Sequence, residues 1–348
     1  MVYFIGSFSL PQKEAKKVRM GGFIPGYGGV TAKDDTILKQ LKERTEIVEI
    51  NTFLLKRCKR PEVIKLLKAV LGRRNRILIG ISSCGRFARA LSAVLYLVNR
   101  RGMEEAVFFV MGGLFADFIR ENRGYQKHVK RYKRVYVETQ AMLRQCREMG
   151  LKNAGYFPNC RIKPDFDIQI RKKGERLQCV FFSMIYPEKG TDLILETAKL
   201  LPEVDFSFWG AINEDYEDVF LKEIHTLENC CYCGIFDKNE KDVYRLLNRY
   251  DILLFLTRCK SEGVPGALIE AKMAGLPAIV SDIAHNREIV EDGVDGIILT
   301  DYAKESLAAV LRALDEDDLY LTGLKNGAQK SGAGYSFENY MDELFAIL

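Results

Sequence analysis

The chain has 348 residues, and at roughly 100 to 200 residues per domain this length favours two domains. With 47% hydrophobic and 28% charged residues, the composition excludes a fibrous, disordered or membrane-embedded chain. The nine cysteines are odd in number and scattered, which argues against a secreted disulfide framework and favours the cytoplasm. The first residues read as a strand and not as a signal peptide, and no apolar run is long enough to span a bilayer.

The net charge of +5 hides a strong asymmetry between the two halves of the chain. Residues 1–167 contain 33 Lys and Arg against 15 Asp and Glu, whereas residues 168–348 contain 19 against 32. One interpretation is a solvated basic face. The other is attraction to an anionic membrane surface or a phosphate-bearing acceptor. No nucleic-acid-binding module accompanies the charge, so we expect no nucleic acid partner.

Short apolar runs alternate with longer amphipathic stretches along the whole chain, which is typical of α/β domains with parallel sheets. A polar, positively charged segment, Arg161–Arg176, separates two series of strands, so we expect domains at residues 1–165 and 166–348. The final residues, about 336–348, should form a closing helix, which we expect to pack back on the N-terminal domain. Predicted strands cover residues 2–7, 47–50, 77–81, 107–110, 135–138, 178–183, 205–209, 252–257, 278–281 and 297–299.

The most informative segment runs from Ser261 to Pro277. A strand precedes it, Pro265 is tolerated in a first helical turn, and Gly275 and Pro277 are stop signals, so it predicts a short helix. The unpaired amides and positive dipole end at the start of such a helix favour a phosphate group. Glu270 would lean toward that start, with Glu262 in the preceding loop. Taken alone, both glutamates could simply complement the helix dipole.

Residues 262–282 read EGVPGALIEAKMAGLPAIVSD and resemble the donor-site motif of the group 1 glycosyltransferases, family 4, in which two glutamates enclose seven residues. Glu262 and Glu270 have that spacing. The resemblance implies the GT-B fold, with two Rossmann-like domains whose parallel sheets face a central cleft. The N-terminal domain would serve the acceptor, and the C-terminal domain the nucleotide-sugar donor.

Other segments are similar to the same family. Pro187-Glu188-Lys189-Gly190 resembles the turn whose lysine contacts the donor diphosphate, and Phe157-Pro158-Asn159 resembles the strand end before the hinge. The run from Pro25 to Thr31 resembles the first glycine loop, which places Gly29 at the donor and Gly28 on the acceptor side. Arg86, after a predicted strand, is a second candidate for the acceptor side.

The resemblance implies a retaining, metal-independent hexosyltransferase without a cofactor, which is expected to act on a glycan or lipid-linked acceptor in cell-surface polysaccharide or glycolipid biosynthesis. Lys189 and Glu262 are the expected catalytic residues, with Glu270 on the ribose hydroxyls. It is expected in the cytoplasm, peripheral at the inner face of the membrane. The donor-binding set is Gly29, Lys189, Gly263, Val264, Pro265, Gly266, Ala267 and Glu270.

Two departures from the family pattern leave alternatives open. Met184 replaces an arginine that would help to hold the diphosphate, so the chain is either compensated by another cation, with Arg258 as candidate, or a catalytically silent nucleotide-sugar-binding partner subunit. None of the three histidines matches the family's histidine position. A nicotinamide-dependent dehydrogenase is disfavoured because no G-x-G-x-x-G follows the first strand.

Three cysteines lie close together in the sequence near residue 230. Cys230, Cys231 and Cys233 have no second pair at ligand spacing, so we predict buried strand cysteines and no metal site.

Overall fold

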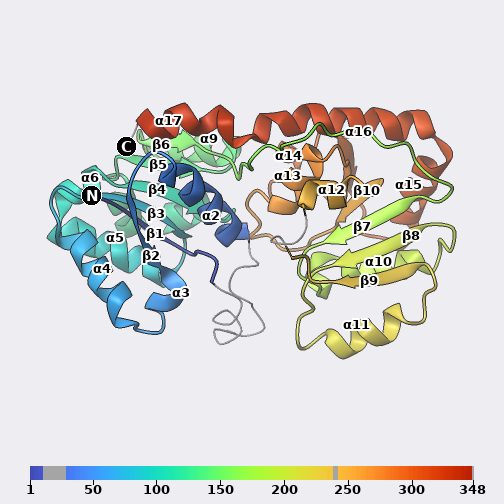
Figure 1. Ribbon diagram of the computed structural model, residues 1–348, viewed down its shortest axis with the longest axis horizontal. Coiled ribbons are helices and arrows are strands. Elements are labelled where there is room, and N and C mark those ends of the chain that lie inside the picture. Colours follow the sequence, from blue (N-terminus) through green and yellow to red (C-terminus); the bar gives the residue numbers. More distant parts are fainter. Residues whose placement is uncertain (11–28, 238–241, 347–348) are drawn as a thin grey trace. The chain divides into compact units, whose positions relative to one another are not determined.

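The computed structural model describes residues 1–10, 29–237 and 242–346, which divide into two compact units (Figure 1). Unit 1 comprises Met1–Cys160, Ser261–Val264 and Tyr340–Leu348. Unit 2 comprises Arg161–Lys260 and Pro265–Asn339. The chain therefore returns to unit 1 twice, once for four residues in the middle of the glutamate motif and once at its end.

Unit 1 is built on a parallel six-stranded sheet in the order β2-β1-β3-β4-β5-β6. Its strands are rich in β-branched and aromatic residues, and most are nearly continuous apolar runs, as expected of a parallel sheet covered on both faces. Their bounds are β1 Val2–Gly6, β2 Ile47–Asn51, β3 Arg76–Ser82, β4 Val107–Met111, β5 Arg134–Val137 and β6 Ala154–Tyr156.

Helices and the end of the chain cover the two faces of this sheet. One face packs its alternate residues, such as Ile79 and Phe108, against buried side chains of α4, α5 and α7 to α9. The other face carries a run of contacting aromatic rings that includes Phe109, Phe157 and Tyr340. The helices of unit 1 are α2 Gly29–Lys42, α3 Thr52–Leu55, α4 Arg60–Leu71, α5 Arg86–Val98, α6 Arg100–Glu104, α7 Phe115–Glu121, α8 Arg123–Val129, α9 Gln140–Glu148 and α17 Met341–Ala346.

Unit 2 is built on a second parallel six-stranded sheet, in the order β12-β11-β10-β7-β8-β9. Its strands are β7 Gln178–Phe182, β8 Asp205–Trp209, β9 Cys230–Gly234, β10 Ile252–Phe255, β11 Ala278–Ser281 and β12 Gly296–Leu299. Its α-helices are α10 Thr191–Ala198, α11 Glu217–Ile224, α12 Val243–Leu247, α13 Gly266–Met273, α14 Asn286–Ile289, α15 Lys304–Glu316 and α16 Asp318–Gly332.

All ten strand ranges predicted from the sequence are present, and two further strands, β6 and β9, lie outside those ranges, although the cysteines of β9 were expected in a strand. The prediction of buried strand cysteines was wrong in part. Cys230, Cys231 and Cys233 do lie in a strand, but β9 is at the edge of its sheet, so Cys231 is exposed and the other two are only half-buried.

The segment Arg161–Arg176 belongs to unit 2 and contains no helix or longer strand. Side chains of α16 hold its backbone, because Gln329 Nε2 donates to the carbonyl of Ile168 at 2.6 Å and Lys325 Nζ donates to that of Arg171 at 2.8 Å. Figure 1 shows it as an extended green trace beside α16. It is therefore a packed strap on unit 2.

The closing helix starts later than the sequence predicted. Residues Phe337–Tyr340 form a 3₁₀ turn, and the α-helix α17 begins only at Met341. The reason is a contact between distant parts of the chain, since Phe337 is buried and its N–H donates to the carbonyl of Arg161 at 2.8 Å, which holds this stretch on unit 2.

Candidate functional site

The turn that carries Lys189 lies between β7 and α10. Pro187–Lys189 form a 3₁₀ turn, and Gly190 follows with a φ of +87°, a conformation that glycine adopts without strain. A Cβ at Gly190 would also lie 2.3 Å from the carbonyl oxygen of Leu256. Only glycine therefore lets the turn pack this closely against the chain that leaves β10.

Lys189 is half-buried, and its Nζ lies 5.9 Å from the centre of the Phe255 ring. Burial lowers the pKa of Lys189 below its ordinary value, because removing water disfavours the charged form. A partly desolvated ammonium interacts more strongly with an anion than a fully hydrated one does. This environment suits a lysine that meets a phosphate.

Arg258 fixes the same turn from the end of β10. Its backbone N–H donates to the carbonyl of Glu188 at 2.7 Å, and its guanidinium donates to the carbonyl of Pro187 at 2.5 Å and to Asp192 at 2.8 Å. The guanidinium also lies 5.0 Å from the centre of the Tyr302 ring. Arg258 is thus bound into the Lys189 turn.

The predicted helix of the glutamate motif is α13, and Pro265 is the residue that precedes its first turn. The amides at the start of an α-helix have no partner within the helix, and the dipole makes this end positive. Glu270 lies one turn further along α13. Because β10 and β7 are neighbouring parallel strands, the chain after β10 and the Lys189 turn after β7 both leave the sheet at the carboxyl ends of its strands.

Glu270 is paired with a residue that the sequence did not single out. Its Oε1 accepts a hydrogen bond from Nε of Arg161 at 2.7 Å, and the two side chains are only 16% and 7% exposed. Arg161 is held in turn by backbone bonds of its N–H to Tyr335 and its carbonyl to Phe337. The carboxylate of Glu270 therefore has a defined orientation.

The first glutamate of the motif belongs to unit 1. The half-buried Glu262 lies in Ser261–Val264, where the carbonyl of Ser261 accepts from the amide of Gly113 at 3.1 Å and the carbonyl of Val264 accepts from Nδ2 of Asn159 at 2.7 Å. The two glutamates of one sequence motif are thus assigned to different units.

The remaining predicted residues lie at the starts of two helices in unit 1. Gly29 is the exposed first residue of α2, and among the described residues beyond its chain neighbours and its own helical turn, none has an atom within 4 Å of the place where its Cβ would be. Gly28 lies outside the described residues. Arg86 is the exposed first residue of α5, at the carboxyl end of β3. For Gly29 and Arg86, no contact with another described residue indicates which ligand they would bind.

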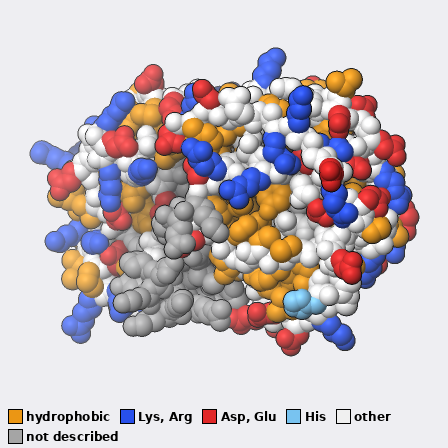
Figure 2. Space-filling model, turned by 45° about the vertical axis from the view of Figure 1, so that its right-hand side comes forward, with side chains coloured by type: hydrophobic (Ala, Val, Ile, Leu, Met, Phe, Trp, Pro, Cys, Tyr) orange, Lys and Arg blue, Asp and Glu red, His pale blue; other side chains and the backbone are white. Residues whose placement is uncertain are grey.

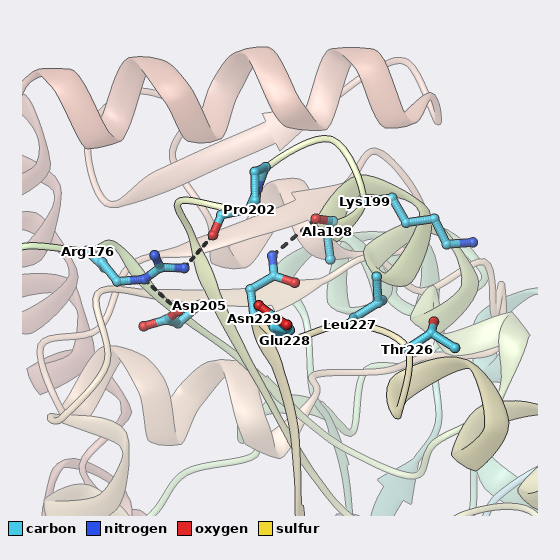
Figure 3. A pocket seen from close by; sticks show the side chains of 9 residues that line it. All are labelled: Arg176, Ala198, Lys199, Pro202, Asp205, Thr226, Leu227, Glu228 and Asn229. Carbon is cyan, nitrogen blue, oxygen red and sulfur yellow. Dashed lines mark hydrogen bonds and ion pairs between the residues drawn. The ribbon is translucent and has the colours of Figure 1, made fainter.

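A hollow of about 420 Å³ opens at the other ends of the strands of unit 2 (Figure 3). Its walls include Arg176 and Asp205, at the amino ends of β7 and β8, and Asn229, just before β9. Arg176 is bonded to Asp205 and to the carbonyl of Pro202. The Lys189 turn and α13 lie beyond the carboxyl ends, so this hollow is separate from the candidate donor site.

Within the described ranges, we find no group of three or more His, Cys, Asp or Glu side chains arranged to hold a metal ion. Over the same part of the chain, every helix is too short or too polar to cross a membrane.

Comparisons with known proteins concern the family and the fold. Residues 163–331 match the family described as glycosyl transferases group 1. The chain is 27% identical over 177 residues to an uncharacterized 41.2 kDa protein in the cps region of Klebsiella pneumoniae, an alignment that covers 51% of this chain and 46% of the relative. It is 28% identical over 167 residues to the amylovoran biosynthesis glycosyltransferase AmsK of Erwinia amylovora, covering 45% of this chain and 41% of the relative. The chain thus spans less than half the length of these curated relatives.

The fold as a whole resembles solved structures. The structure of Anabaena HepE in complex with UDP covers 100% of this chain and 99% of its own, with a TM-score of 0.67 and 17% identity. A second structure of HepE contains UDP-glucose. At this identity the likeness shows the fold alone. Residues 163–331, just under half of the chain, therefore match the group 1 glycosyltransferases, family 4, and the chain as a whole has the GT-B fold.

Proposed function

We propose that the chain is a retaining, metal-independent hexosyltransferase that transfers a sugar from a UDP-sugar to a hydroxyl acceptor. The observation that carries this proposal is the environment of Lys189. This half-buried cation lies on the turn after β7, and Arg258 binds that turn to the end of β10, the neighbouring strand that leads into α13. Sugar transfer builds negative charge on the leaving diphosphate, and preorganised cations and amides stabilise such charge. The presence of UDP and UDP-glucose in the HepE structures supports uridine as the base.

Lys189 and the predicted residues between Glu262 and Glu270 have the following roles in this proposal. Lys189 and the amides around Gly266 and Ala267 bind the diphosphate, Glu270 accepts the ribose hydroxyls, and Glu262 orients the donor sugar. Pro265 starts the helix, while Gly263 and Val264 carry the backbone from Glu262 to that helix. In the transfer step the anomeric carbon–oxygen bond to the diphosphate breaks as the acceptor oxygen bonds to the same face. A leaving phosphate oxygen takes the acceptor proton, so no metal or protein base is required.

The pathway we propose is cell-surface polysaccharide or glycolipid synthesis, with a glycan or lipid-linked acceptor. The relatives in the cps region and in amylovoran biosynthesis support it.

The binding half of the proposal is tested by thermal shift with UDP, GDP and ADP. A nucleotide at 100 times its dissociation constant adds about 2.7 kcal/mol to the stability of the folded state. We expect a shift with UDP alone. The absence of a thermal shift with any of the three nucleotides would reject the proposed donor site.

The catalytic half is tested with UDP-hexoses. NMR of the product should show the anomeric configuration of the donor, and turnover should persist in EDTA. A wild-type protein that binds UDP but releases none from any UDP-sugar would favour the alternative suggested by Met184, a catalytically silent partner subunit.

We further propose that unit 1 docks on an anionic membrane surface, the inner face of the membrane, through α4 and α5. These adjacent helices expose apolar side chains at helical spacing, in a group that we call the α4/α5 face. Its members are Ile64, Leu67, Leu71, Phe87, Val94, Leu97 and Val98.

Exposed basic residues border this face, among them Lys68, Arg73, Arg74, Arg89 and Arg100. At the left-hand edge of Figure 2, blue Lys and Arg side chains stand among orange hydrophobic ones. Apolar side chains framed by cations suit the boundary between acyl chains and anionic headgroups.

A further inference from the structure

A buried ion pair in unit 1 joins α2 to the end of β5. Nζ of Lys33 lies 2.8 Å from Oε1 of Glu138, and the two side chains are 1% and 5% exposed. Lys33 also donates to the carbonyl of Phe157 at 3.4 Å, and its Nζ lies 5.7 Å from the centre of the Phe157 ring. Neither charged residue has a role in the function derived above.

The second oxygen of Glu138 faces the motif segment Ser261–Val264. Oε2 accepts from the backbone N–H of Val264 at 3.5 Å, at the long end of hydrogen bonding. A Cβ at Gly263 would lie only 2.3 Å from the same oxygen. The glycine after Glu262 is therefore required by the carboxylate that lies against it.

Three adjacent strands of unit 1 hold this segment at their carboxyl ends. Gly113, after β4, donates to the carbonyl of Ser261. Glu138, directly after β5, accepts from Val264. Asn159, after β6, donates to the carbonyl of Val264. The backbone on both sides of Glu262 is thus fixed by groups from rigid elements, which is how an active-site side chain is held in place.

The ion pair is costly as a purely structural device. Removing two charges from water is expensive, and well-packed hydrophobic residues often replace such pairs without loss of stability. A carboxylate without Lys33 would also be an uncompensated buried negative charge beside the amide of Val264. Lys33 neutralises Glu138 and leaves its second oxygen available to the segment.

We propose that Glu138 and Lys33 are positioning residues that fix the backbone around Glu262 for the donor sugar. This inference rests on the proposed function, because it assigns Glu262 to the sugar. It predicts that the pair affects recognition of the UDP-sugar more than recognition of UDP.

The test compares Glu138→Gln and Lys33→Met with the double variant. The matched control is Lys42→Met combined with Glu49→Gln, an exposed Lys–Glu pair that also joins α2 to a strand of unit 1. Hydrogen exchange of peptides that cover residues 261–264 reads the segment directly. Isothermal titration with UDP and with UDP-glucose, together with donor kinetics, reads the site.

In both single variants we expect exchange at the Val264 amide to rise at least tenfold. We expect the dissociation constant for UDP to change less than threefold, while binding of UDP-glucose weakens and turnover falls by about 10- to 100-fold, because misplacement by about 1 Å has this effect. The double variant should recover part of the loss, since neither partner is then left as an unpaired buried charge. The control should match wild type.

Unchanged exchange at Val264 in both single variants would overturn the proposal, and so would equal losses for UDP and UDP-glucose. If Glu138→Gln does not fold, Gly263→Ala disturbs the same contact from the segment side and should give the same pattern. Failure of the wild-type protein to bind UDP would reject the proposed function instead. Hydrogen exchange at residues 261–264 would still show whether Glu138 and Lys33 hold this segment.

Discussion

Arg161 and Glu270 form a nearly buried ion pair in unit 2, with 2.7 Å between Nε and Oε1. One oxygen of Glu270 is thereby tied to a guanidinium that is itself held by the backbone of Tyr335 and Phe337. A carboxylate oriented in this way loses little freedom when it accepts ribose hydroxyls, and such preorganisation favours binding.

Glu270→Ala is expected to weaken UDP binding by about 10- to 100-fold while turnover at saturating donor falls much less. The reason is that ribose contacts are the same in the ground state and in the transition state. Titration calorimetry and donor kinetics measure both quantities. An unchanged donor Michaelis constant with lost turnover would contradict this role.

Arg161→Ala is expected to weaken UDP binding by roughly tenfold, because Glu270 loses its orientation. Combined with Glu270→Ala it should add little, since residues in direct contact act as a unit. Arg245→Ala, which removes another arginine of unit 2, stacked on Phe166, is the control. Fully additive losses in the double variant would show that Arg161 acts independently of Glu270.

Lys189→Ala is expected to reduce turnover by roughly 100- to 1,000-fold, the effect of losing one preorganised donor to developing charge. Lys199→Ala, a surface lysine of unit 2 paired with Glu196 and Glu223, should leave turnover unchanged. A Lys189 variant within threefold of wild type would remove this residue from the site.

The lowered pKa of Lys189 gives UDP affinity a defined pH dependence. Below that pKa the ammonium is charged in free and bound protein, so affinity is constant. Above it, the free protein must take up a proton to bind, so affinity falls by up to tenfold per pH unit. The fall should begin below 10.5, the ordinary pKa. Calorimetry at rising pH measures it, and Lys189→Arg should remove the fall.

The α4/α5 face predicts binding to anionic vesicles that weakens as salt rises, with each basic residue near the surface contributing about 1 kcal/mol. Leu67→Glu combined with Leu97→Glu should reduce sedimentation with such vesicles at least tenfold, because burying each leucine contributes about 1.5 to 3 kcal/mol. Leu319→Glu, at an exposed leucine of unit 2, is the control. Equal binding to neutral vesicles would contradict the electrostatic part.

The sequence predicts the elements well where apolar runs are long. It misses β6, which has only three residues, Ala154–Tyr156, and for β9 it predicts strand cysteines without giving the bounds of the strand or its place at the sheet edge. It also places the start of the last helix five residues too early, because the bond between Phe337 and the carbonyl of Arg161 joins residues far apart in the chain.

The candidate site divides in the same way. The sequence alone suggests Lys189, Glu262 and Glu270 as site candidates, because each lies in a contiguous motif. Arg161, Lys33 and Glu138 carry no local signal, since their partners lie more than 100 residues away and only the packed sheets bring them together.

The last prediction concerns Arg258 and Met184, where the chain departs from the family pattern. The structure binds the guanidinium of Arg258 to Pro187 and Asp192, so we expect it to act through the Lys189 turn. Arg258→Ala should therefore lower turnover by about tenfold or more and weaken UDP binding. Arg258→Lys should rescue little, because a lysine cannot reproduce two directed guanidinium bonds.

Asp192→Asn separates the two possible roles of Arg258. If Arg258 holds the turn, loss of Asp192 should impair turnover in the same direction. If Arg258 contacts the diphosphate itself, releasing it from Asp192 should leave turnover unchanged or raise it. Met184→Arg completes the set, because it restores the arginine of the family pattern. If wild type is almost inactive and Met184→Arg gains turnover, the chain is a catalytically silent relative. If wild type turns over well and Arg258→Ala leaves that turnover unchanged, the role of Arg258 is rejected while the proposed glycosyltransferase activity stands.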